Sequence, residues 1–232
     1  MHGEGRRLLA VVCRNPEVGR VKTRLIPALG EDGARVLYRA FLRDLGERFA
    51  GRTYDLLWAY TPEGEAPPST LTPGLTRMQE GPDLGHRLLQ LFAWATVDGY
   101  ERMVVISSDV PHLPAAVIDG AFEALAECDV VLAPSEDGGY HLVGMSAPHD
   151  VFTMVPMSTT LVLAQTREVV AASGLTLRLL ETDFDVDEPE DLPRLAARLA
   201  QDSALRQGHT ARALHRRSMH PSPATRDELP TE

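Results

Sequence analysis

The residues best suited to chemistry lie in one short loop, residues 15–25. The loop contains Gly19 and three basic side chains, Arg20, Lys22 and Arg24. Lys22 is the only lysine among the 23 lysine and arginine residues of the chain. A single lysine in an arginine-rich chain indicates a site that needs a compact ammonium, and phosphate oxygens are its natural ligand. A solvated basic loop is the alternative, because the phosphate-loop pattern itself is absent.

A second set of candidates consists of aspartates that follow apolar runs. Asp109 comes directly after the run at 103–107, and Asp185 and Asp187 follow a later strand. Asp185 and Asp187 share a face in an extended chain. If these carboxylates meet, they form an all-oxygen site for Mg²⁺ or Mn²⁺, which shares its remaining positions with substrate phosphates. The alternative role is helix capping, for Asp109 before the prolines at 111 and 114 and for Asp187 before Pro189.

Two further loops carry candidate residues. Glu136 and Asp137 precede a Gly-Gly pair, where a backbone can approach a ligand closely. A surface hairpin turn is the alternative for this loop. Gln79, Asp83 and Gly85 lie before a helical pattern and suit contact with a base or a sugar hydroxyl, although a helix start explains them equally well.

The spacing of apolar residues predicts alternating strands and helices around these loops. Continuous apolar runs predict strands buried on both faces, and positions recurring three or four residues apart predict helices. The expected class is therefore α/β with a mostly parallel sheet, in which ligands bind beyond the carboxyl ends of the strands. The predicted strands are 7–13, 53–60, 75–79, 102–107, 129–133, 140–145 and 175–180. The predicted helices are 31–50, one from Asp83 through Ala95, 114–127, 159–173 and 189–201.

Length and composition restrict the remaining possibilities. With 232 residues and 44% hydrophobic content, we expect one domain over residues 1–202, with a loosely helical or disordered tail over 203–232. The formal net charge of −10 argues against nucleic acid as a partner. No apolar run is long enough for a membrane span. The only two cysteines, Cys13 and Cys128, lie in apolar surroundings, as in a reduced cytoplasmic protein.

Taken in order, the motifs resemble a known family over roughly residues 7–200. The motifs are Val21-Lys22-Thr23-Arg24-Leu25, Ser108-Asp109-Val110-Pro111, Glu136-Asp137-Gly138-Gly139-Tyr140, Ser158-Thr159-Thr160 and the run from Asp185 to Leu192. Together they resemble a bacterial glycosyltransferase family of the nucleotide-diphospho-sugar transferase superfamily, of the type associated with arsenosugar biosynthesis or radical-SAM neighbours. That family is similar in fold to 2-phospho-lactate guanylyltransferase. The resemblance implies a GT-A-like three-layer α/β sandwich.

The same resemblance implies roles for the donor side of the site. Arg20, Lys22 and Arg24, with Gly19 in the same loop, would hold the phosphates of a nucleotide-activated donor. Gln79, Asp83 and Gly85 would lie near the base or ribose.

On the other side, the resemblance implies metal ligands and an acceptor site. Asp109 would bind Mg²⁺ or Mn²⁺, with Asp185 or Asp187 as a second ligand. Glu136 and Asp137 would face a small acceptor, and either is a candidate general base. His112 and Met157 depart from the family pattern near the acceptor.

The function predicted first is therefore metal-dependent glycosyl transfer from a nucleoside diphosphate sugar to a small acceptor. Catalysis would rest on Lys22, Asp109, Glu136 and Asp137. A nucleotidyltransferase that joins a nucleoside monophosphate to a phosphorylated small molecule and releases pyrophosphate is the first alternative, because it needs the same loop and metal. A nucleotide-binding module without catalysis is the second. The sequence leaves the donor, the acceptor and the oligomeric state open.

Overall fold

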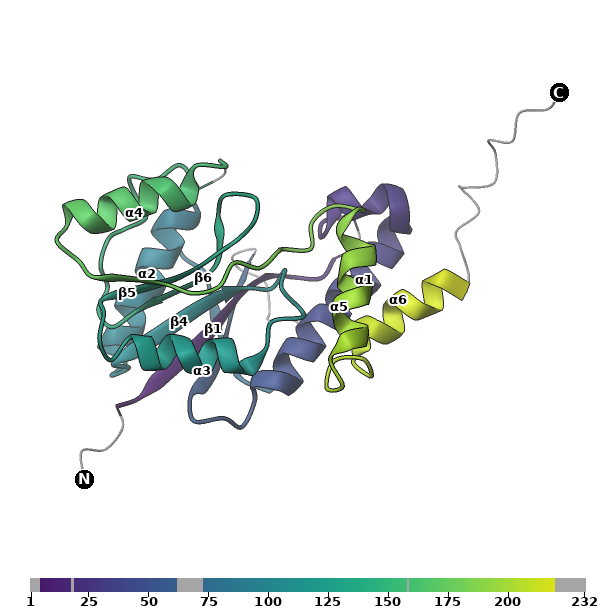
Figure 1. The fold of residues 1–232 in the computed structure, drawn as a ribbon, viewed down its shortest axis with the longest axis horizontal. Coiled ribbons are helices and arrows are strands. Elements are labelled where there is room, and N and C mark those ends of the chain that lie inside the picture. The colour runs from purple at the N-terminus through teal and green to yellow at the C-terminus, as the bar shows by residue number, and fades with distance from the viewer. Residues whose placement is uncertain (1–4, 18, 62–72, 158, 220–232) are drawn as a thin grey trace.

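The computed structural model describes residues 5–17, 19–61, 73–157 and 159–219. Its centre is a seven-stranded sheet in the order β3-β2-β1-β4-β6-β5-β7 (Figure 1). The strands are β1 Arg7–Arg14, β2 Asp55–Thr61, β3 Leu75–Met78, β4 Arg102–Ser107, β5 Val130–Pro134, β6 Tyr140–Met145 and β7 Leu177–Leu179. The helices are α1 Ile26–Phe49, α2 Leu84–Val97, α3 Ala115–Ala124, α4 Val162–Ala172, α5 Asp191–Gln201 and α6 His209–Met219, with a short 3₁₀ turn at Thr23–Leu25.

The sheet is parallel except at one strand. β1 pairs in parallel with both β2 and β4, whereas β6 runs antiparallel between β4 and β5. β6 can reverse direction because only residues 135–139 connect it to β5, and Gly138 in this turn has a positive φ of 91°. The carboxyl ends of β1 and β4 therefore lie beside the start of β6, which brings the candidate loops to one edge of the sheet.

The apolar runs of the strands supply two cores, one on each face. In β1, Leu9, Val11 and Cys13 pack into one core, while Leu8 and Ala10 pack into the other. This division follows from the alternation of side chains along a strand. Both faces of the strand are buried, which explains why the run contains no polar alternation.

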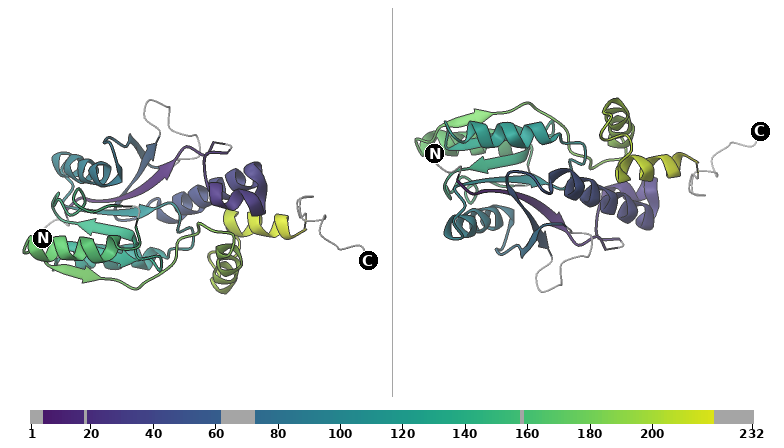
Figure 2. Two further views of the ribbon diagram at one scale, coloured as in Figure 1. Left: turned by 90° about the horizontal axis from the view of Figure 1, so that it is seen from above. Right: turned by 90° about the horizontal axis from the view of Figure 1, so that it is seen from below.

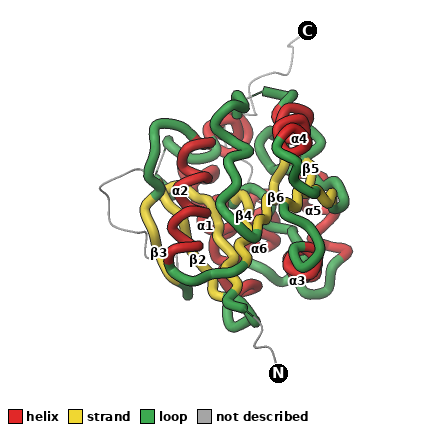
Figure 3. Tube along the Cα trace, turned by 90° about the vertical axis from the view of Figure 1, so that its left-hand side faces the viewer, coloured by secondary structure: helices red, strands yellow, loops and turns green. Residues whose placement is uncertain are grey.

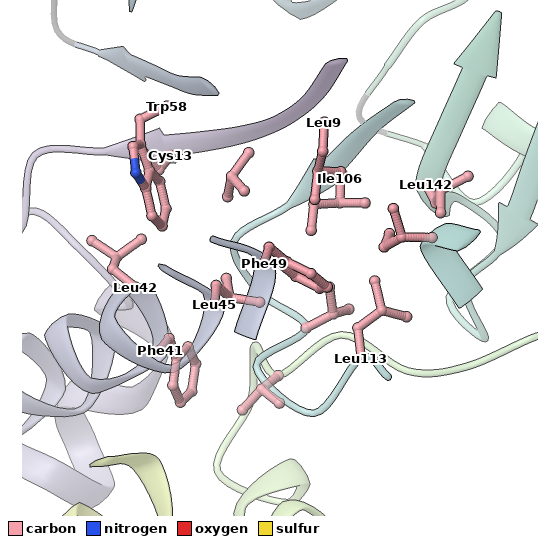
Figure 4. Packing of buried hydrophobic residues seen from close by; sticks show 14 of the residues in the cluster. Leu9, Cys13, Phe41, Leu42, Leu45, Phe49, Trp58, Ile106, Leu113 and Leu142 are labelled. Carbon is pink, nitrogen blue, oxygen red and sulfur yellow. The ribbon is translucent and has the colours of Figure 1, made fainter. Parts of the chain in front are cut away.

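The helices cover these two faces and make three layers. Side chains of α1 and α3 belong to the first core, and those of α2 and α4 belong to the second. Figure 1 shows α4 above the strands and α3 below them, and Figure 3 shows the strands between helices. Figure 4 shows Phe41, Leu45 and Phe49 of α1 beside Leu9 and Cys13 of β1. The predicted α/β three-layer sandwich is confirmed.

The first helix and the C-terminal region differ in detail from the sequence prediction. The predicted helix at 31–50 is extended by a turn from Ile26, and Gly30, with φ 68° and ψ 164°, separates the two parts. The sequence predicts a loosely helical or disordered tail from residue 203. The structure instead has α6, which packs on α1 beyond the sheet (Figure 2).

The buried Asp44 of α1 accounts for this docking. It accepts the backbone N–H groups of His209 and Thr210, at 2.7 and 2.8 Å, and so caps the first turn of α6. A cap supplied from another helix leaves no local sequence signal. The rest of the predicted tail, 220–232, lies outside the described residues, as does the predicted loop at 62–72. None of the described helices combines the length and apolar character that crossing a bilayer requires.

Candidate functional site

Lys22 connects the basic loop to the aspartates. Its Nζ atom lies 2.7 Å from Oδ1 of Asp109 and 2.8 Å from Oδ1 of Asp187, and it donates to the carbonyl oxygen of Val186 at 2.6 Å. The lysine side chain is only 5% exposed, whereas the aspartates are 31% and 45% exposed. Burial acts to lower the pKa of Lys22, but the two carboxylates outweigh it and raise the pKa. The ammonium therefore stays charged.

The backbone of Lys22 is held in an uncommon conformation. Lys22 has φ 49° and ψ 44°, and it is the one non-glycine residue with positive φ in the part of the chain that the structure describes. For a residue with a Cβ this left-handed conformation costs roughly 1–2 kcal/mol. Such strain persists where the surroundings over-determine it, commonly at functional sites. Here the three contacts of the ammonium supply that constraint.

The chain segment 183–187 brings the remaining acids to the same place. Asp183 donates its N–H to the carbonyl of Pro134 at the end of β5, and Val186 donates to the carbonyl of Asp109 beyond β4. The segment therefore crosses two strand ends. Asp185 accepts a hydrogen bond of 2.5 Å from the hydroxyl of Ser135, and Asp187 reaches Lys22.

The capping roles considered for Asp109 and Asp187 do not hold. The N-cap residue of α3 is Pro114 and that of α5 is Glu190, and no side chain accepts a capping hydrogen bond at either position. Both aspartates therefore keep their carboxylates for Lys22.

Two adjoining clefts meet at this cluster. The first, the basic cleft, has a volume of about 670 Å³. Its cationic lining residues are Arg14, Arg20, Lys22, Arg24 and Arg87. The second, the acidic cleft, has a volume of about 540 Å³. Its carboxylates are Asp109, Asp137, Asp185 and Asp187. Arg24, Asp109 and Asp187 line both, so they form the junction.

Charge repulsion is concentrated on Asp185. Its pKa is raised to about 7, first by burial and then by the charges of Asp109, Asp187 and Asp137, while the hydrogen bond from Ser135 opposes the shift. The single ammonium of Lys22 thus faces several carboxylates in a partly buried cleft. This excess of oxygen donors fits a divalent cation such as Mg²⁺, which needs only one or two protein carboxylates beside phosphate oxygens and water.

The three predicted metal ligands do not form a complete cage by themselves. Among the described residues, the group of three side chains whose ligand atoms all lie within 4.8 Å of one another is Asp44, Glu47 and His209. Both carboxylate oxygens of Asp44 are already used to cap α6, so this group is explained by helix docking. A cation at the cleft would therefore need ligands from a substrate or water in addition to the aspartates.

The predicted phosphate loop lines the basic cleft only in part. Arg20 and Arg24 line it, although each pairs with a nearby glutamate, Glu17 and Glu188, at 3.2 Å. Gly19, with φ 71°, shapes the loop and is not among the lining residues.

Of the residues predicted near the base, one lines the basic cleft. Gln79 is buried, and its amide nitrogen donates to the carbonyl of Ala59 at 2.7 Å. Asp83 instead caps α2 by accepting the N–H of His86 at 2.9 Å. Gly85 is needed for packing, because a Cβ there would lie 3.0 Å from the carbonyl oxygen of Phe152. Asp83 and Gly85 line neither the basic nor the acidic cleft.

The loop at 136–139 separates its two acids. Asp137 lines the acidic cleft and accepts the N–H of Gly139 at 2.9 Å. Glu136 forms a paired ion bridge with Arg194 of α5 and lines neither cleft, so the structure does not bring it to the predicted acceptor. The sequence cannot reveal this partner because Arg194 lies 58 residues away.

Three residues that line the clefts escaped the sequence prediction. Arg14 is the last residue of β1, so its place at a strand end was available as a signal. Arg87 lies in the first turn of α2, and Ser135 follows β5 and holds Asp185. Nothing in the residue types alone distinguishes these two from ordinary surface positions.

Comparisons with known proteins agree with the fold. A solved structure from Desulfovibrio desulfuricans G20, described as a candidate nucleotide-diphospho-sugar transferase, superposes with a TM-score of 0.86 at 31% identity, over 93% of this chain and 96% of that one. A cytidylyltransferase from Leptospira borgpetersenii serovar Hardjo-bovis superposes at 12% identity with a TM-score of 0.52, over 98% and 100% of the two chains, and shares the fold.

A sequence relative carries a named reaction. Phosphoenolpyruvate guanylyltransferase from Chloroflexus aggregans is 30% identical over 105 residues, which is 43% of this chain and 50% of the relative. The chain thus matches about half the length of that protein. A family model described as "Uncharacterized protein conserved in bacteria (DUF2064)" matches residues 43–159, half of the chain. The chain belongs to this DUF2064 family, within the nucleotide-diphospho-sugar transferase superfamily and similar to a guanylyltransferase.

Proposed function

We propose that the protein is a nucleotidyltransferase that joins a nucleoside monophosphate to a phosphorylated small molecule and releases pyrophosphate. The observation that carries this proposal is the pairing of Lys22 with Asp109 and Asp187, the two aspartates that line both the basic and the acidic cleft. The named guanylyltransferase relative supports nucleotidyl transfer over the glycosyl transfer that the sequence places first.

The proposed reaction is a substitution at the α-phosphorus of a nucleoside triphosphate. An oxygen of the acceptor phosphate attacks the α-phosphorus of a nucleoside triphosphate. The bond from that phosphorus to the oxygen bridging to the β-phosphorus breaks, and pyrophosphate leaves with the electron pair. Little covalent chemistry is required of the protein, so positioning and neutralisation of charge dominate.

The basic cleft suits the triphosphate. Arg14, Arg20 and Arg87 offer planar guanidinium groups that can bind phosphate oxygens in pairs. Arg24 lies at the junction, where the leaving pyrophosphate and the acceptor phosphate both come close. Lys22 serves a different task from the one expected from the sequence, because its ammonium is already bonded to two carboxylates and holds them in place.

Asp109, Asp187 and Asp185 are the residues that would hold a divalent cation. When bound, the cation neutralises charge on the phosphates during transfer. Asp137 lies in the acidic cleft on the acceptor side, whereas Glu136 has no role in this proposal because Arg194 engages it.

A direct experiment is a pyrophosphate-release assay. GTP, CTP, UTP and ATP are each incubated with the protein, Mg²⁺ and a set of phosphorylated acids that includes phosphoenolpyruvate. We expect release with one triphosphate that requires an acceptor. Asp109→Asn is expected to reduce the rate by about 100-fold or more, because one group that neutralises or positions transition-state charge commonly contributes that much. Arg178→Gln, far from the clefts, is the control.

Glycosyl transfer is the second candidate, favoured by the similarity to the Desulfovibrio structure. It predicts release of a nucleoside diphosphate from a nucleotide sugar and no pyrophosphate from any triphosphate. The two products distinguish the candidates in one chromatographic assay. Binding without turnover of either kind would instead favour a nucleotide-binding module.

A further inference from the structure

A third cleft, remote from the candidate site, lies between α1 and α6. It has a volume of about 700 Å³ and shares no lining residue with the basic or the acidic cleft. Figure 2 shows α6 beside α1 at the end of the molecule beyond the sheet. We call it the α1–α6 groove.

The two helices that form the groove are fixed relative to one another by hydrogen bonds and by packing. The cap that Asp44 gives α6 is buried, and both of its carboxylate oxygens accept backbone N–H groups of α6. His209 adds a contact of 2.9 Å from its Nε2 to Glu47 of α1. Leu205, just before α6, is also buried in the first core.

The polar part of the groove is strongly basic in an otherwise acidic protein. Five arginines line it: Arg35, Arg39, Arg43, Arg212 and Arg216. Arg35 pairs with Asp32, the one carboxylate in the lining. Within the described part of the chain, Arg39, Arg43 and Arg216 form no ion pair with a carboxylate. The formal net charge of the whole chain is −10, so the groove carries a local charge of opposite sign to that of the chain.

The remaining lining is aliphatic. Leu37 and Ala40 lie at the buried base of the groove, Val36 is 52% exposed, and α6 contributes Ala213 and Leu214. The lining that the structure describes contains no Phe, Tyr or Trp, and its one ring, His209, is engaged by Glu47. Single-stranded nucleic acids favour aromatic stacking platforms in their sites, so this mixture of aliphatic base and arginine rim favours a polypeptide.

Charge also decides between a second copy and a different partner. A symmetric contact between two such faces would place the arginines of both copies against one another, which is unfavourable. An amphipathic helix can fill the space between two helices with its apolar stripe and offer carboxylates to the rim on either side. We infer that the α1–α6 groove is a docking site for an acidic amphipathic helix of a partner protein.

Fluorescence anisotropy with a defined probe tests this inference. The probe is a labelled 18-residue helical peptide with a leucine stripe and glutamate at its polar positions. A second peptide replaces every glutamate with lysine. The groove variant is Arg39→Glu with Arg43→Glu, and the matched control is Arg167→Glu with Arg178→Glu, which makes the same charge change on α4 and β7.

We expect saturable binding of the glutamate peptide, at least tenfold weaker for the groove variant and unchanged for the control. Circular dichroism confirms that both variants are folded. Equal binding of the lysine peptide, equal weakening by both variants, or no binding by the wild type would overturn the inference. Light scattering adds a second readout: a mass above the monomer that the groove variant abolishes would assign the groove to another copy of this chain instead.

Discussion

Removal of the Lys22 side chain tests how the site is held together. In Lys22→Gly, Asp109 and Asp187 lose their shared ammonium, while the left-handed backbone conformation loses its cost of roughly 1 kcal/mol. Breaking a buried ion pair typically costs about 3–5 kcal/mol, and the 31% and 45% exposure of the two aspartates reduces this to about 2–3 kcal/mol. We therefore expect a net loss of about 1–2 kcal/mol in the free energy of unfolding.

The comparison with Lys22→Ala separates the side chain from the backbone. Alanine loses the same contacts and keeps the strain, so it should be about 1 kcal/mol less stable than glycine at this position. Arg20→Gly is the control, since its exposed pair with Glu17 is expected to contribute less than about 1 kcal/mol.

Urea unfolding at pH 7, with fluorescence and circular dichroism as probes, measures these differences. Repeating it with 10 mM Mg²⁺ adds a second test, because a cation should recover part of the loss in Lys22→Gly by neutralising the same carboxylates. Wild-type stability in Lys22→Gly, or equal stability of the glycine and alanine variants, would refute the role assigned to Lys22.

Three other perturbations have outcomes fixed by the structure. Burial lowers the pKa of His141 to about 4, so the unfolded chain takes up a proton before the folded protein does as pH falls from about 6.5. The free energy of unfolding should therefore decline by up to about 3 kcal/mol between about pH 6.5 and pH 4. Urea unfolding across that range measures the decline, which His141→Phe should flatten. Asp44→Ala removes the cap of α6 and should cost about 1–2 kcal/mol while exposing residues 205–219 to limited proteolysis, whereas unaltered cleavage would contradict the docking described here. Gly138→Ala places a Cβ 2.1 Å from the carbonyl oxygen of Thr160 at a φ of 91°, so it should lower the melting temperature by several degrees, and an unchanged melting temperature would show that this turn is less constrained.

The fold was predictable because its signals are local. Apolar runs such as residues 8–13 mark strands buried on both faces, and the carboxyl ends of those strands identified Lys22, Asp109 and Asp187 as neighbours before any coordinates. The position of Arg14 at the end of β1 belongs to the same logic, although it was not recognised.

What the sequence could not supply are pairings between distant segments. The engagement of Glu136 by Arg194 and the capping of α6 by Asp44 join residues 58 and about 165 positions apart. Asp83 looked equally suited to ligand and cap, and only the position of the His86 N–H decided for the cap. For Lys22 the sequence predicts phosphates as ligands, and the structure adds Asp109 and Asp187 as partners of its ammonium.

The central claim is that Asp109 and Asp187 form part of one site for a divalent cation and a nucleotide. Electron paramagnetic resonance of free Mn²⁺, titrated with protein in the presence and absence of GTP and CTP, measures this directly. We predict that one nucleotide strengthens Mn²⁺ binding to the wild type and that Asp109→Asn with Asp187→Asn abolishes the strengthening. Equal Mn²⁺ binding with and without every nucleotide, or unchanged coupling in the double variant, would contradict the claim.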